Sequence, residues 1–159
     1  MRVRATLVAA AAILGCMAAT PSDNAVIVNS GSTNSYGYAI HVSADGKGTF
    51  TLQNRGGSAA SSSKPFTVPA ATATRFFLDL AAARKGNMTA EPCMKSASFG
   101  TSTHVSWQGW TSPDLSCPPN GSLGEALVKD VDAIRKAAGI NELPLRQPKS
   151  AATPLEPRR

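Results

Sequence analysis

Two segments of this chain carry their larger apolar residues at every second position, and each is followed by a segment with the period of an amphipathic helix. Residues 38–42 and 103–107 show the alternation of a strand that buries one face. Residues 72–85 and 122–138 place their apolar residues three and four apart instead. This order predicts an α+β fold, with an antiparallel sheet of two hairpin-plus-helix units (ββαββα) and both helices on one face.

The turn residues decide the register of the first hairpin. A three-residue loop over 44–46 would set Ile40 opposite Phe50, and Gly46 would take the left-handed position of a type I turn with a G1 bulge. A two-residue Asp-Gly loop would set Phe50 opposite His41 and mix the two faces of the hairpin. We therefore predict the three-residue loop.

Local signals also mark the helices and the domain limits. Gly86 follows the first helical segment, and Ser122 and Glu125 have the spacing of a capping box at the start of the second. Residues 55–64 are rich in Gly, Ser and Ala, which predicts a flexible loop. The predicted domain spans residues 25–139, after a short β-branched run at its start.

The first sixteen residues predict export. Two arginines precede an apolar stretch over 5–14, which is too short to span a bilayer, and small residues follow it. Residues 13–16, Ile-Leu-Gly-Cys, resemble a bacterial lipobox, so Cys16 is the predicted site of lipid attachment. Residues 17–24 would then be a tether, and the domain would lie on the periplasmic side of a bacterial membrane as a lipoprotein.

Cysteine usage agrees with an oxidising compartment. Cys93 and Cys117 are predicted to form a disulfide, which leaves Cys16 as the odd cysteine. A lipid on Cys16 explains the odd count, and so does its removal with the signal. Ordinary cleavage near residues 17–19 would give a soluble periplasmic or secreted protein, and the sequence leaves both alternatives open.

The net charge of +6 is spread along the chain rather than gathered. Residues 20–139 hold ten basic and eight acidic side chains, and the remaining excess lies in the signal and in the tail. No basic stripe interleaved with aromatic residues is present, so a nucleic acid is not a predicted partner. Residues 140–159 are interrupted by prolines and are predicted to be a disordered tail.

Few side chains are suited to catalysis or to metal binding. Only two histidines occur, His41 and His104, so we predict no metal site and no cofactor. An alternative function is a small exported serine-type hydrolase with His104 as its base. Its remaining candidates are Asp79 or Asp114 to orient the base, and Ser96, Ser98 or Ser102 as the nucleophile. No G-x-S-x-G motif is present, so a non-catalytic function is the preferred prediction.

Aromatic residues are the predicted contacts for a partner. Trp107 continues the alternation of its strand and is predicted to lie in the core. Trp110, beyond a predicted turn, and Tyr36 are the predicted partner contacts. We therefore expect a non-catalytic binding or structural module of the cell envelope, anchored by lipid, whose partner is an envelope protein or a ligand of unknown identity.

Three strings of the sequence carry a resemblance. Residues 29–34 (NSGSTN), 93–103 (CMKSASFGTST) and 112–118 (SPDLSCP) resemble strings in a group of exported bacterial proteins, predicted lipoproteins, to which no activity is assigned. The resemblance covers most of the predicted domain. It implies export and a bacterial source, and it implies no catalytic residue.

Overall fold

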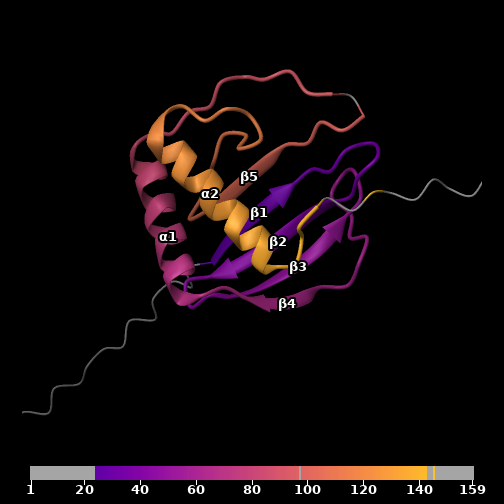
Figure 1. Cartoon of the computed structure of the whole chain (residues 1–159), viewed down its shortest axis with the longest axis horizontal. Coiled ribbons are helices and arrows are strands. Elements are labelled where there is room, and N and C mark those ends of the chain that lie inside the picture. Colours follow the sequence, from indigo (N-terminus) through magenta and orange to yellow (C-terminus); the bar gives the residue numbers. More distant parts are fainter. Residues whose placement is uncertain (1–23, 97, 143–144, 146–159) are drawn as a thin grey trace, which may run out of the picture.

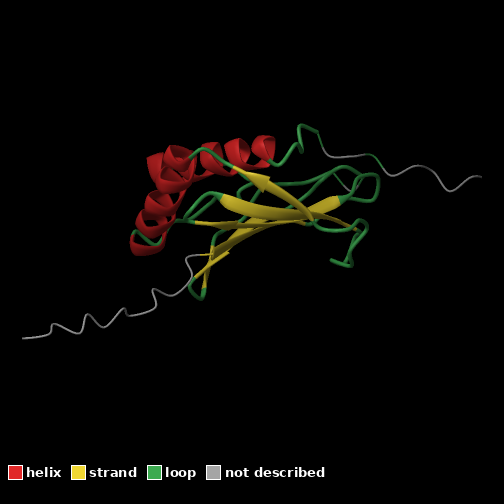
Figure 2. Ribbon diagram, turned by 90° about the horizontal axis from the view of Figure 1, so that it is seen from below, coloured by secondary structure: helices red, strands yellow, loops and turns green. Residues whose placement is uncertain are grey.

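The computed structural model of the chain describes residues 24–96, 98–142 and 145. These residues form a six-stranded antiparallel sheet in the order β4-β3-β2-β1-β5-β6, with two helices on one face (Figures 1 and 2). The elements are β1 (Asn24–Asn29), β2 (Gly37–Ser43), β3 (Lys47–Gln53), β4 (Lys64–Thr67), α1 (Ala70–Lys85), β5 (Thr103–Trp107), β6 (Trp110–Thr111) and α2 (Gly121–Ala137). The predicted signal, Cys16 and most of the predicted tail lie outside the described residues.

The predicted α+β class is confirmed, but the predicted ββαββα order is wrong, because four strands precede α1 and two precede α2. The additional strand β4 begins at Lys64, where a flexible loop was predicted to end. This strand is short and contains Pro65, so it has no alternating pattern of its own, and it forms by pairing with β3 at the edge of the sheet. Lysine and proline are common on edge strands, because they discourage pairing with another chain.

The predicted register of the β2–β3 hairpin is confirmed. Ile40 lies opposite Phe50, and Tyr38 lies opposite Leu52. Gly46 has a φ of +83°, and its N–H donates to the carbonyl oxygen of Ser43 at 2.9 Å. The left-handed glycine and the three-residue loop therefore set which side chains of this hairpin face the helices.

The predicted capping box of α2 is wrong. Asn120 is the N-cap of α2, without a side-chain capping bond, and Ser122 lies inside the first turn. Thr89 holds the entry to the helix in place, because its carbonyl oxygen accepts from the Asn120 N–H at 3.2 Å and its hydroxyl accepts from Asn120 Nδ2 at 3.2 Å. The bonds from Asn120 to Thr89, which lies far away in the sequence, therefore fix the start of α2 in place of the predicted Ser122 capping box.

The core lies between the helices and the face of the sheet that they cover. Alternate residues of β1, β2 and β5 meet the buried faces of both helices there. Its largest completely buried apolar side chains are Ile27, Ile40, Phe76, Leu80, Leu127 and Ile134. Ile140, in the predicted tail, is also buried, so the packed domain continues past residue 139. No helix in the described part of the chain is long and apolar enough to cross a membrane.

The two ends of the sheet carry different segments. We call the end where β1 begins the near end; the turns at 44–46 and 108–109 also lie there, and α1 lies across it (Figure 1). We call the opposite end the far end, and the strings at 29–34, 93–103 and 112–118 meet there. Since β1 has six residues, the two ends are about 17 Å apart.

Candidate functional site

The three strings that carry the resemblance converge at the far end, although they lie far apart in the sequence. Asn29 is buried at the end of β1, and its Nδ2 donates to Thr103 Oγ1 at 2.9 Å and to Thr101 Oγ1 at 3.2 Å. The N–H of Ser30 donates to the carbonyl oxygen of Ser102 at 2.9 Å, and the N–H of Ser102 donates to Ser30 Oγ at 2.9 Å. These bonds join the first string to the second.

Two glycines allow the backbone to close around Asn29. The N–H of Gly31 donates to Asn29 Oδ1 at 2.9 Å, and Gly31 has a φ of +62°, in the left-handed region. A Cβ atom on Gly37 would lie 2.2 Å from the carbonyl oxygen of Asn29, which is closer than real Cβ atoms approach backbone. The sequence Asn-Ser-Gly therefore has a structural role, since it lets the start of β2 touch the end of β1.

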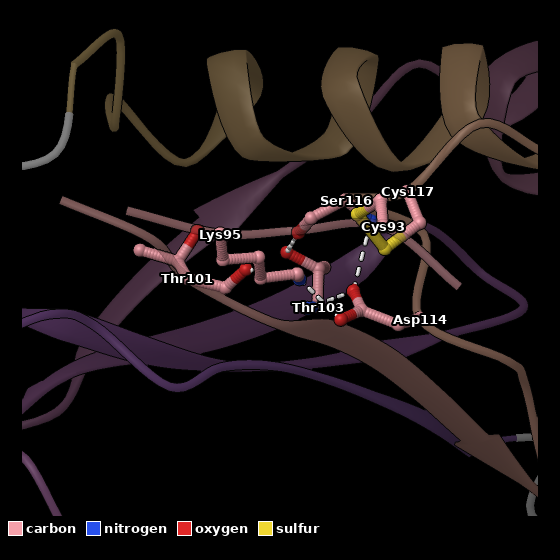
Figure 3. The surroundings of a disulfide bond; sticks show 7 residues. All are labelled: Cys93, Lys95, Thr101, Thr103, Asp114, Ser116 and Cys117. Carbon is pink, nitrogen blue, oxygen red and sulfur yellow. Dashed lines mark hydrogen bonds and ion pairs between the residues drawn. A yellow bond between two sulfur atoms is a disulfide. The ribbon is translucent and has the colours of Figure 1, made fainter. Parts of the chain in front are cut away.

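The predicted disulfide between Cys93 and Cys117 is confirmed, and Asp114 holds the chain beside it (Figure 3). Asp114 Oδ1 accepts from the N–H of Thr103 at 3.0 Å and from the N–H of Ser116 at 2.9 Å, while Oδ2 pairs with the Lys95 ammonium. Burial alone would raise the pKa of Asp114, but Lys95 and the two N–H groups outweigh it and hold this pKa below its usual value. The ion pair thus joins the second string to the third.

This polar junction presents two apolar side chains to solvent. Met94 is fully exposed and Phe99 is 63% exposed, and both lie on the segment between Cys93 and β5. The segment is fixed at one end by the disulfide and the Lys95 ion pair and at the other by the pairing of Ser102 with Ser30. Neither residue was singled out from the sequence. The one signal available is that both are apolar residues in a Ser/Thr-rich string that has the period of neither a strand nor a helix.

The residues of the predicted hydrolase lie in separate places. His104 alternates with the buried Thr103 and Val105 along β5, so it lies on the sheet face opposite the helices, and its Nδ1 donates to the carbonyl oxygen of Ser112 at 3.0 Å. Asp79 is on α1 and the Asp114 carboxylate is occupied by Lys95, Thr103 and Ser116, so neither orients His104. Among the described residues, no hydrogen bond joins His104 to a serine hydroxyl.

The other candidate serines also have backbone roles. Ser96 Oγ accepts weakly from the N–H groups of Ser98 and Phe99, at 3.3 and 3.4 Å. Ser102 is bound to Ser30 as described above. His41 lies on the same open face of the sheet as His104, but on β2, with β1 between them. In the described part of the chain, no three His, Cys, Asp or Glu side chains gather closely enough to hold a metal ion.

The two predicted partner contacts lie at opposite ends of the sheet. Trp110 is opposite Trp107 at the near end, and both are half-buried against the core. Tyr36 precedes β2 at the far end and is also half-buried. The two residues therefore belong to two separate surfaces, and each remains a predicted contact in its own right.

A groove of about 430 Å³ between α1 and α2 contains two neighbouring carboxyl groups, the buried Asp130 and the half-buried Asp79. Asp130 is completely buried, and its Oδ1 accepts from Arg75 Nε at 2.5 Å. Its Oδ2 has no hydrogen-bond partner among the described residues, and the Asp79 carboxyl lines the same groove, close enough to affect the pKa of Asp130. Burial raises the pKa of Asp130, Arg75 opposes this rise, and Asp79 adds to it. Ser122, Glu125, Ala126 and Lys129 complete the lining.

Comparison with known proteins assigns no activity to these sites. No protein-family model, no curated protein and no solved structure matches the chain. What these sites do is therefore inferred from the residues that form them.

Proposed function

We propose that this chain is a non-catalytic binding module of the bacterial cell envelope, held at the membrane by lipid on Cys16. The observation that carries the binding function is the exposure of Met94 and Phe99 on a segment fixed at both ends. An exposed aromatic residue on a segment fixed at both ends favours binding, because less conformational entropy is lost when a partner covers it. We propose an envelope protein as the partner.

The position of this segment agrees with an anchored module. The predicted tether leads into the start of β1 at the near end, whereas Met94 and Phe99 lie on the segment that enters β5 at the far end. A domain anchored at the near end would present these two side chains away from the anchor. The Lys95–Asp114 pair and the disulfide would keep their position fixed when a partner binds.

The anchor is tested by the intact mass of the protein purified from its own membranes, before and after reduction. We expect a chain that begins at Cys16 with acyl groups attached, and a gain of two hydrogens when the disulfide is reduced. A mature chain without acyl groups, or one that begins after residue 16, would overturn the anchoring.

The partner surface is tested by a photo-cross-linking amino acid placed at position 99 and, as a matched control, at position 78. Leu78 is 66% exposed on α1, against 63% for Phe99, so the two sites differ in place rather than in exposure. We expect one discrete protein adduct from position 99 in cells, and its loss when Met94→Ser is added without a change in melting temperature. Equal protein adducts from both positions would contradict a specific surface at Phe99.

A second candidate, the serine-type hydrolase, is favoured by one observation. Because a carbonyl oxygen can only accept, His104 Nδ1 carries the proton in its bond to Ser112, which leaves Nε2 to act as a base in the neutral ring. The test is turnover of a panel of small esters by the wild-type protein and by His104→Ala. Turnover that is absent, or unchanged in His104→Ala, would contradict this candidate.

A further inference from the structure

The outward side of α1 carries a large apolar side chain that does not pack in the core. Phe76 and Leu80 are completely buried, while Leu78, on the opposite side of the helix, is 66% exposed. The last turn of α1 carries Arg84 and Lys85, and its first turn carries no acidic residue. Lys85 follows Leu78 by two helical turns, so these two exposed side chains share the outward side of α1, where a cation and an apolar group can both contact an anionic lipid surface.

The acidic residue of α1 does not neutralise the positive charge of its last turn. Asp79 is the single acidic residue in α1, and it lines the groove toward α2, beside Asp130. Arg84 donates to Gln108 Oε1 at 2.9 Å, and its guanidinium carbon lies 6.0 Å from the centre of the Trp107 ring. The cationic end of α1 is therefore continuous with the β5–β6 turn at the near end.

The length of chain ahead of β1 restricts which surface can face the membrane. If lipid is attached at Cys16, seven residues, 17–23, separate it from the first residue of β1. Seven residues span at most about 25 Å when fully extended. Since β1 begins at the near end, the anchor holds the start of β1 within this distance of the lipid headgroups. The helix α1 lies across the same end (Figure 1), and the far end lies about 17 Å further along the sheet.

We propose that the outward side of α1 docks on the anionic phospholipid surface of the membrane that holds the anchor, and this inference rests on the anchoring in the proposed function. Lys85 pairs with a headgroup phosphate, and Leu78 enters the interface between headgroups and acyl chains. Arg84, held beside the β5–β6 turn, adds positive charge at the same end of the sheet. Docking of α1 turns the far end, with Met94 and Phe99, away from the bilayer.

The chain contains its own reporter for this orientation. It has two tryptophans, Trp107 and Trp110, and both flank the turn at the near end. Energy transfer from tryptophan to a dansyl group on a lipid headgroup therefore measures how closely the near end approaches the bilayer. Position 85 is suited to substitution, because Lys85 is exposed and, unlike Arg84, is not stacked on Trp107.

The experiment reconstitutes the acylated protein in vesicles of phosphatidylethanolamine and phosphatidylglycerol that contain dansyl-phosphatidylethanolamine, and compares them with phosphatidylcholine vesicles. We expect strong transfer in the anionic vesicles and weak transfer in the neutral ones. Lys85→Glu reverses one charge and should lower the ratio of docked to undocked protein about 30-fold. Leu78→Ser should also reduce transfer. Phe99→Ser, which removes an equally exposed apolar side chain at the far end, should leave transfer unchanged.

Equal transfer in anionic and neutral vesicles, or transfer that Lys85→Glu does not reduce, would overturn the docking of α1. Intact mass reports the anchor independently of this result. If the mature chain carries no acyl group, a chain that begins at Cys16 can be coupled through that thiol to a maleimide phospholipid. The same comparison of vesicles then decides whether α1 docks. The two proposals can therefore fail separately.

Discussion

The buried Asp130 carboxyl, with the half-buried Asp79 beside it, predicts that Asp79→Asn stabilises the protein. Asp130 is completely buried, one of its oxygens lacks a donor, and the Asp79 carboxyl lies beside it. An unpaired buried polar atom costs about 1–3 kcal/mol, and the amide group introduced at position 79 can donate a hydrogen bond to the Asp130 carboxylate. Removal of the like charge adds to this gain. We expect about 1.5 kcal/mol of added stability at neutral pH, or about 5 °C in melting temperature for a domain of this size.

The same substitution should change the pH dependence of unfolding. The pKa of Asp130 is raised in the folded protein, so the stability linked to its proton is fully present below the unfolded pKa of about 3.9 and is lost as pH rises through the folded pKa. Replacement of Asp79 removes one cause of the raised pKa. The gain from Asp79→Asn should therefore be small near pH 4, at about the unfolded pKa, and larger above the folded pKa.

Thermal and denaturant unfolding, followed by circular dichroism from about pH 4 to about pH 8, measures both effects. Glu125→Gln is the matched control, because Glu125 lines the same groove but is exposed, and it should leave the melting temperature nearly unchanged. Destabilisation by Asp79→Asn at neutral pH, or a gain that is the same at both ends of the pH range, would refute a stabilising effect from removal of the Asp79 charge.

Three further predictions concern the far end. Gly37→Ala should destabilise the domain by more than about 2 kcal/mol in denaturant unfolding, because the new Cβ would lie 2.2 Å from the Asn29 carbonyl oxygen; a loss below about 0.5 kcal/mol would contradict the close approach. Replacement of both Cys93 and Cys117 by serine should lower the free energy of unfolding by about 3 kcal/mol, given their separation of 24 residues, and a pair of melts with and without reductant checks this in the wild type. The pKa of Asp114 is lowered in the folded protein, so the stability that this carboxylate contributes is present above the unfolded pKa of about 3.9 and is lost as pH falls through the folded pKa. Asp114→Asn should therefore remove that part of the acid sensitivity, which melts below about pH 5 would measure.

Local patterns predicted the elements whose determinants lie close together in the sequence. The register of the β2–β3 hairpin followed from Gly46 and the alternation on either side of it, and the structure has that register. The disulfide followed from the count of cysteines in a chain with a predicted export signal. Strand β4 could not be predicted in this way, because its pairing with β3, rather than any period of its own, makes it a strand.

The candidate sites depend on contacts between distant residues, and no local pattern contains them. Asn29 meets Thr103 across 74 positions, and Arg75 meets Asp130 across 55. Residues on a helix or strand face can be assigned from their period, but which faces meet depends on the topology of the sheet. The exposure of Phe99 could not be predicted either, because contacts with distant residues, the disulfide and Asp114, fix the segment that carries it.

The place of β1 in the sheet has a mechanical consequence. This strand is the first described element, and it pairs with β2 on one side and with β5 on the other. A pull on the chain ahead of Asn24 acts along the axis of β1 and loads the hydrogen bonds of both ladders in shear, so many bonds must break together rather than one after another. A strand at the edge of the sheet would peel away with far less force. The domain should therefore resist unfolding when a force is applied at its amino-terminal end.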